Sequence, residues 1–96
     1  MTKMANALKD LDRLAKSDYS KARVFFQMGK YEEALAAYVE SDKAWKKMAE
    51  LFFEKGKENH GTEFLEKAKE AQSHIGMCLF KLGKYTEALE IVNSAL

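Results

Sequence analysis

A short motif, Phe-x-x-Gly-Lys, occurs three times in this chain at a constant period, with its copies beginning at Phe26, Phe53 and Phe80. The first and third copies extend into closely similar stretches, FQMGKYEEAL and FKLGKYTEAL. We call the separation in sequence from Phe26 to Phe80 the repeat offset. A fixed period of about 27 residues is typical of helical repeat proteins, in which one helix-turn unit is used several times. We therefore expect stacked helices joined by turns at the three glycines of the motif, which are Gly29, Gly56 and Gly83.

The apolar residues between these glycines recur at spacings of three, four or seven, which places them on one face of a helix. The chain contains no proline and is rich in residues that lose little freedom in a helix. These patterns predict an all-α fold, an antiparallel helical bundle or set of hairpins forming a single domain over residues 1–96. The expected helices cover residues 4–28, 31–55, 61–82 and 85–96.

The turns have more specific expectations. Gly29 and Gly83 stand where the apolar stripes end, so we expect a positive φ at each, as in a helix C-cap. The segment GKENHGT, after the second helix, is expected to be a true loop. Asn59 or Thr62 would then provide the N-cap of the third helix.

The stretches GKYEEALAAY and GKYTEALEIV resemble the turn and second helix of tetratricopeptide repeats. In that family a glycine precedes an aromatic residue, and a small residue follows where two helices touch. Matching residues are Gly29, Tyr31, Ala34, Leu35 and Tyr38, and again Gly83, Tyr85, Ala88, Leu89, Val92 and Ala95. The small residue of the family's first helix matches Ala22, Ala49 and Gly76. The middle unit departs from the pattern, with Glu58 for the aromatic residue and Gly61 for the alanine.

The period is also shorter than that of the family, whose units repeat every 34 or so positions. The missing residues correspond to the loop between units, where this chain reads AAYVESDKAWKK without glycine or proline. We therefore expect one continuous helix from Tyr31 to Lys55. The alternative is a break at Ser41 and Asp42, since both residue types are good N-caps.

The two alternatives place the motif phenylalanines differently. If each unit were a separate hairpin, Phe26, Phe53 and Phe80 would lie on equivalent faces and line one groove. If each unit is one long helix, successive helices run in opposite directions, and Phe53 lies at the end of the bundle opposite to the other two. The unbroken apolar stripe favours the second arrangement.

A second family shares part of the pattern. FLEKAKEA, from Phe64 to Ala71, is similar to the third helix of microtubule-interacting and trafficking (MIT) domains, three-helix bundles that bind a partner helix. That resemblance leaves the last segment, GKYTEALEIVNSAL, without a counterpart.

Composition excludes several classes of function. The net charge of +1 is far from the basic surface of a nucleic-acid-binding protein, and no apolar run reaches the roughly 20 residues needed for a membrane helix. The single cysteine, Cys78, favours a reducing cytoplasm and a buried, inert thiol. His60, expected in the loop, and His74, expected at or near a helix surface, are not spaced to ligate a metal together. No catalytic, cofactor-binding or metal-binding residue is predicted.

The resemblance to tetratricopeptide repeats implies a non-enzymatic interaction module or adaptor that binds a protein or peptide. A helical-bundle enzyme or metal carrier is the alternative from another class. Self-association is expected through the C-terminal helix, where Ile91, Val92 and Leu96 form an apolar tail. The candidate partner-binding residues are Tyr19, Arg23, Phe26, Lys43, Lys46, Lys47, Phe53, Met77 and Phe80. The lysine–asparagine clamp with which some tetratricopeptide domains bind a C-terminal carboxylate has no counterpart at the matching positions.

Overall fold

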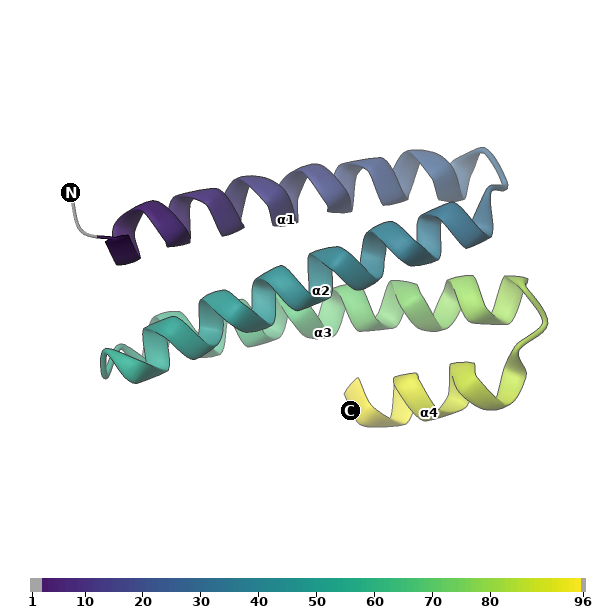
Figure 1. Cartoon of the computed structure of the whole chain (residues 1–96). Helices are drawn as coiled ribbons and strands as arrows, with labels where there is room; N and C mark the ends of the chain where they lie inside the picture. The colour runs from purple at the N-terminus through teal and green to yellow at the C-terminus, as the bar shows by residue number, and fades with distance from the viewer. Residues whose placement is uncertain (1–2, 96) are drawn as a thin grey trace.

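The computed structural model describes residues 3–95, and its elements are four helices in sequence (Figure 1). They are α1 (Lys3–Gln27), α2 (Tyr31–Glu54), α3 (Glu58–Lys81) and α4 (Tyr85–Ala95). Each helix runs antiparallel to the one before it, and α4 is less than half as long as the others (Figure 1). The predicted all-α fold of antiparallel hairpins is confirmed.

The helices pack in sequence order, α1 on α2, α2 on α3 and α3 on α4. The result is an open, flat stack in which α1 and α4 occupy opposite edges (Figure 1). The Cα positions extend over 44 × 25 × 13 Å. An open stack leaves one face of each edge helix without a neighbour among the described residues, which matters for the site below.

All three motif glycines have positive φ, 77° at Gly29, 73° at Gly56 and 79° at Gly83. At the first turn, the Gly29 amide donates to the Phe26 carbonyl and the Lys30 amide donates to the Phe25 carbonyl. This pair of hydrogen bonds is the Schellman motif, and it repeats at both later turns. The predicted positive φ at Gly29 and Gly83 is confirmed. The recurring motif therefore ends one helix with a Schellman turn, and the next helix begins directly after it.

The prediction of a loop at GKENHGT is wrong. The third helix begins at Glu58, not at residue 61, and Lys57 is its N-cap residue, without a side-chain cap hydrogen bond. Asn59 and Thr62 therefore lie inside α3 and do not cap it. The Schellman turn at Gly56 needs no loop residues of its own, because the Lys57 amide donates to the Phe52 carbonyl of α2 and Lys57 is also the N-cap residue of α3.

Gly61 explains how the helix continues there. A β-carbon on Gly61 would lie 2.7 Å from the ring of Phe53, so glycine lets that ring lie against α3. In the other two turns the equivalent phenylalanine packs edge-on against a tyrosine, with centroids 5.2 Å apart for Phe26 and Tyr31. Glu58 replaces that tyrosine in the middle turn, and Gly61 provides the alternative packing surface.

The helix from Tyr31 is continuous through Ser41 and Asp42, as predicted. Both side chains are buried and bond to neighbouring helices, not to their own backbone. The Ser41 hydroxyl donates to the Ala15 carbonyl at 3.0 Å. The Gln72 amide donates to the Asp42 carboxylate at 3.2 Å, and Lys46 lies 3.1 Å from the other Asp42 oxygen. These bonds fix the register of α1, α2 and α3. They occupy the two side chains that would have capped a new helix if the chain had broken here.

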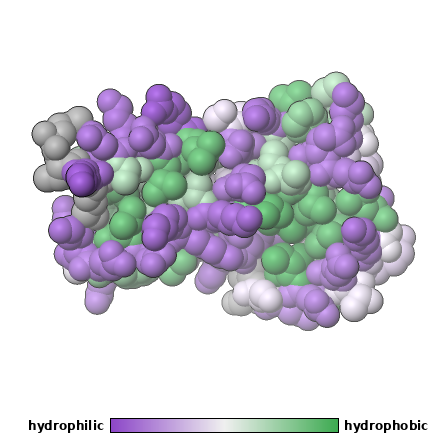
Figure 2. Space-filling view, viewed as in Figure 1, coloured by the Kyte–Doolittle hydropathy of each residue, from purple (hydrophilic) through white to green (hydrophobic). Residues whose placement is uncertain are grey.

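Two apolar clusters form the core. One lies toward the α1–α2 and α3–α4 turns and includes Ala22, Tyr38, Ile75 and Cys78. The other lies toward the α2–α3 turn and includes Trp45, which stacks on Phe64 at 5.7 Å. Figure 2 shows apolar surface toward both ends of the viewed face, with hydrophilic residues between them.

Candidate functional site

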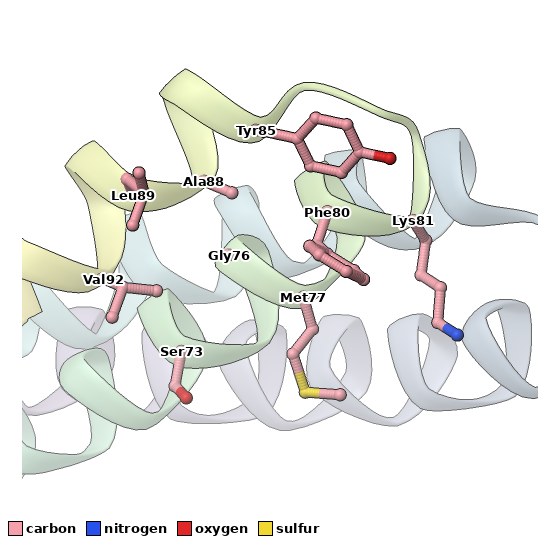
Figure 3. Close-up of a pocket in the computed structure, with 9 residues that line it drawn as sticks. All are labelled: Ser73, Gly76, Met77, Phe80, Lys81, Tyr85, Ala88, Leu89 and Val92. Atoms are coloured by element: carbon pink, nitrogen blue, oxygen red, sulfur yellow. The ribbon is translucent and has the colours of Figure 1, made fainter.

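The most distinctive surface is a groove of about 640 Å³ between α3 and α4 (Figure 3). Met77 and Phe80 project from α3, and Tyr85, Leu89 and Val92 project from α4. The residues that line this α3–α4 groove are Ser73, Gly76, Met77, Phe80, Lys81, Tyr85, Ala88, Leu89 and Val92. Its wall is predominantly apolar, so it offers a surface for another apolar side-chain stripe.

The apolar side chains of the groove are unusually exposed. Leu89 is 65% exposed, Tyr85 60% and Phe80 59%, while Met77 and Val92 are 49% and 40% exposed. At about 200 Å² for a large side chain, these five leave about 550 Å² of surface in contact with water. That is as large as the largest apolar patch on a typical monomer, and such patches often mark an interaction site.

The groove forms because α4 packs closely on α3. A β-carbon on Gly76 would lie 2.7 Å from a methyl of Val92 and 3.3 Å from one of Ile91, so glycine permits the approach. Ala88 is 7% exposed at the same contact. Ile91 faces the core, whereas Leu89 and Val92 face the groove. The predicted apolar tail is therefore only partly exposed, and Leu96 lies outside the described residues.

The candidate residues Met77 and Phe80 both line the groove. The candidates Phe26 and Phe53 do not. Phe26 is half-buried on Tyr31 at the α1–α2 turn. Phe53 is next to the last residue of α2, at the other end of a helix whose 24 residues span about 36 Å. The structure therefore has no groove shared by the three motif phenylalanines, in agreement with the favoured arrangement.

Tyr19 belongs to an aromatic cluster that the sequence patterns missed. The His74 ring stacks on the Tyr38 ring with centroids 4.9 Å apart, and Tyr19 packs edge-on against both. Burial lowers the pKa of His74, the nearby Arg23 charge lowers it further, and Glu70 opposes the change. Burial also raises the pKa of Tyr38 to about 12. This cluster joins α1, α2 and α3, and its rings, with Tyr38 buried and Tyr19 and His74 partly buried, serve packing.

Of the remaining candidates, the three lysines of α2 each lie beside an acid on the same helix. Lys43 is 3.5 Å from Glu40, Lys46 is 3.1 Å from Asp42 and Lys47 is 3.7 Å from Glu50. These pairs offset the positive charge, so the arrangement does not favour an acidic peptide on α2. Arg23 is exposed on α1 beside the aromatic cluster.

The groups with potential chemistry are dispersed. Cys78 is buried, and burial raises the pKa of its thiol to about 11, which disfavours the reactive thiolate. His60 packs on Phe52 with centroids 5.2 Å apart. Over residues 3–95, no group of three or more histidine, cysteine or acidic side chains is placed to hold a metal ion. Within the same range, no helix combines the length and apolarity needed to cross a bilayer.

Of the groove residues, Tyr85 and Leu89 were not predicted as binding residues, whereas Val92 was expected in the self-associating apolar tail. Their positions in the repeat suggested helix packing, and the expected place of the exposed apolar surface was the chain end. The signal was nevertheless present, because Leu89 matches Leu35 when the two similar stretches are aligned. Leu35 packs against the core beside α3, whereas no helix follows α4 in the described chain.

A comparison with family models matches the tetratricopeptide repeat at residues 15–44 and again at residues 69–96, which together make up more than half of the sequence. The starts of the two matches are separated by the repeat offset, in agreement with the two similar stretches. The segment between the two matches, residues 45–68, contains the middle turn with Glu58 and Gly61. No relative was found among curated proteins. The chain belongs to the tetratricopeptide repeat family.

Proposed function

We propose that this protein is a non-enzymatic adaptor whose α3–α4 groove binds one amphipathic helix of a protein partner. Tetratricopeptide repeats generally mediate protein–protein interaction. The proposal adds a specific surface to that general role. It rests on one observation, the exposed apolar wall formed by Phe80, Tyr85 and Leu89.

The shape of the occupant follows from the internal repeat. Residues 15–44 form an N-terminal hairpin and residues 69–95 a C-terminal hairpin, related by the repeat offset. The groove of the N-terminal hairpin is filled by α3, whose Ile75 and Cys78 share one cluster with Ala22, Ala34 and Tyr38. An equivalent groove in the C-terminal hairpin should therefore accept a helix with apolar residues at i, i+3 and i+4, as in α3.

The alternative functions have less support. The helical-bundle enzyme or metal carrier requires convergent polar groups, and the dispersed chemistry of the described residues offers none. The resemblance to MIT domains rests on residues 64–71, which lie mostly outside the two family matches. A cytoplasmic location stays a prediction from the single cysteine.

The proposal is tested with a peptide that carries the sequence of residues 66–82, the helix that fills the equivalent groove. Binding of the fluorescently labelled peptide to the full chain is measured by anisotropy in the presence of a reducing agent. We expect saturable binding in the micromolar to millimolar range, because an isolated helix of this length must also be ordered.

Two matched variants locate the binding. Leu89→Glu places a charge in the groove and should weaken binding at least tenfold. Leu65→Glu introduces the same change at an exposed leucine outside the groove and should leave binding unchanged. No saturable binding, or an equal loss in both folded variants, would contradict the proposed site.

A further inference from the structure

We propose that the partner helix is α1 of a second copy of this chain, so that copies assemble head to tail. This inference rests on the proposed function, because it names the occupant of the α3–α4 groove. The internal repeat supports it, because the repeat relates the exposed face of α1 to a buried face of α3.

Among the residues with described side chains, the exposed large apolar residues of α1 and of the position directly after it are Leu14, Val24 and Met28, at 50%, 55% and 59% exposure. On a helix they lie within about 80° of one another, on the same face as Ser17 and Lys21. We call these five residues the donor face. This face is directed away from the Ala15 and Ala22 side chains that pack in the core.

The donor face has a counterpart in α3, one repeat offset further along the chain. The counterparts of Leu14, Ser17, Lys21, Val24 and Met28 are Ala68, Ala71, Ile75, Cys78 and Leu82. In α3 the first four of these residues are at most 5% exposed. The face of α3 that packs toward the preceding helices is therefore repeated on α1, where it is exposed.

The acceptor surface shows the same relation. The groove residues Gly76, Phe80, Ala88 and Val92 stand one repeat offset after Ala22, Phe26, Ala34 and Tyr38. The earlier four belong to the cluster that includes Ile75 and Cys78 of α3, or pack against it. The helices α1 and α4 lie at opposite edges of the stack (Figure 1). The edge formed by α4 thus carries an unfilled copy of the acceptor groove, and the edge formed by α1 carries an uncovered copy of the docking helix face.

Charge supports the pairing of these two edges. The α1 segment has six lysines and arginines against three aspartates, for a net charge of +3. The α4 segment has two glutamates and no lysine or arginine, for a net charge of −2. Placing α1 of one copy beside α4 of another brings opposite charges together, whereas pairing α4 with α4 brings like charges together.

The buried area predicts weak association. The five apolar groove residues and the three of the donor face together expose about 870 Å² of surface, at about 200 Å² per large side chain. Stable interfaces bury about 1,200–2,000 Å² in total, so this contact belongs to the weak class. Because the two surfaces differ, each added copy presents a new free groove, and assembly continues into short oligomers or a ring.

The test is sedimentation velocity of the full chain over a concentration series that reaches the millimolar range, with folding of each variant checked by circular dichroism. The wild type should show a mass that rises beyond the dimer. Val24→Glu on the donor face and Leu89→Glu in the groove should each be monomeric, and Leu65→Glu should associate as the wild type does.

A mixture of the two monomeric variants is decisive. Val24→Glu keeps an intact groove and Leu89→Glu keeps an intact donor face, so their mixture should form a dimer and stop there. Lys21→Ile makes the donor face match Ile75 of α3, and it should lower the dissociation constant about tenfold.

Three results would overturn the inference: a monomeric wild type, undiminished association of Val24→Glu, or a mixture that stays monomeric. Undiminished association of Val24→Glu with loss in Leu89→Glu would indicate symmetric pairing of α4 helices. If the peptide of residues 66–82 still binds the groove in these cases, the proposed function stands and only the identity of the occupant is wrong.

Discussion

Substitution of Gly29 by alanine tests the origin of the repeated motif in a single step. Gly29 has a φ of 77°, and a β-carbon there would meet nothing within 4 Å. The cost is therefore one of backbone conformation, without a steric clash. The left-handed conformation costs an L-residue roughly 1–2 kcal/mol, and alanine returns about 0.4–1 kcal/mol by restricting the unfolded chain.

The net loss in the free energy of unfolding should be about 1 kcal/mol, measured by urea denaturation with an unchanged m value. Gly29→Asn should lose less, because asparagine tolerates this conformation. The double variant Gly29→Ala/Gly56→Ala should lose about 2 kcal/mol, since the two turns lie at opposite ends of α2. An alanine variant as stable as the wild type, or more stable than the asparagine variant, would refute the assignment of the motif as a conformational stop.

The remaining predictions concern buried groups. Burial lowers the pKa of His74, so as the pH drops the unfolded state takes up a proton before the folded state does. The free energy of unfolding should therefore fall as the pH drops through about 6.5. In urea denaturation at a series of pH values, His74→Phe should flatten this slope, and the control His60→Gln should keep it. Added to the Val92→Ala variant, Gly76→Ala should raise the free energy of unfolding by up to about 1 kcal/mol, because Val92→Ala removes the methyl that would lie 2.7 Å from the new β-carbon. Added to the wild type, Gly76→Ala should give no such gain, and equal effects in the wild-type and Val92→Ala backgrounds would contradict this contact. Cys78, with its pKa raised to about 11, should react with a thiol reagent only after unfolding, and rapid reaction of the folded protein would contradict its burial.

Much of the fold follows from the sequence because its signals are local. The glycine of each motif copy requires a backbone conformation that other residues adopt at a cost, and the apolar stripes reveal which helix face is buried. Both signals were sufficient to predict helix ends within one residue at Gly29 and Gly83. The boundary at the third helix failed because polar residues such as Asn59 also favour loops, and the Schellman turn before them could not be distinguished from a loop start.

The groove was harder to predict because its exposure depends on whether a further helix packs over α3 and α4. Leu35 and Leu89 occupy equivalent positions in the repeat, yet one packs against the core and the other is 65% exposed. Helical periodicity describes which residues share a face, but not whether another helix lies on that face. Likewise, Ser41 and Asp42 left a helix break as the alternative to the predicted continuous helix, and only the positions of Ala15 and Gln72 on neighbouring helices reveal their interhelical bonds.

The central claim is that the α3–α4 groove accepts a helix, and amide chemical shifts test its location most directly. The uniformly ¹⁵N-labelled full chain is titrated with the unlabelled peptide of residues 66–82 while its amide resonances are followed. The account predicts shifts concentrated in residues 73–81 and 85–92, with α1 and the first half of α2 little changed. Shifts concentrated on α1 or along α2, with the amides of Phe80 and Leu89 unmoved, would contradict it.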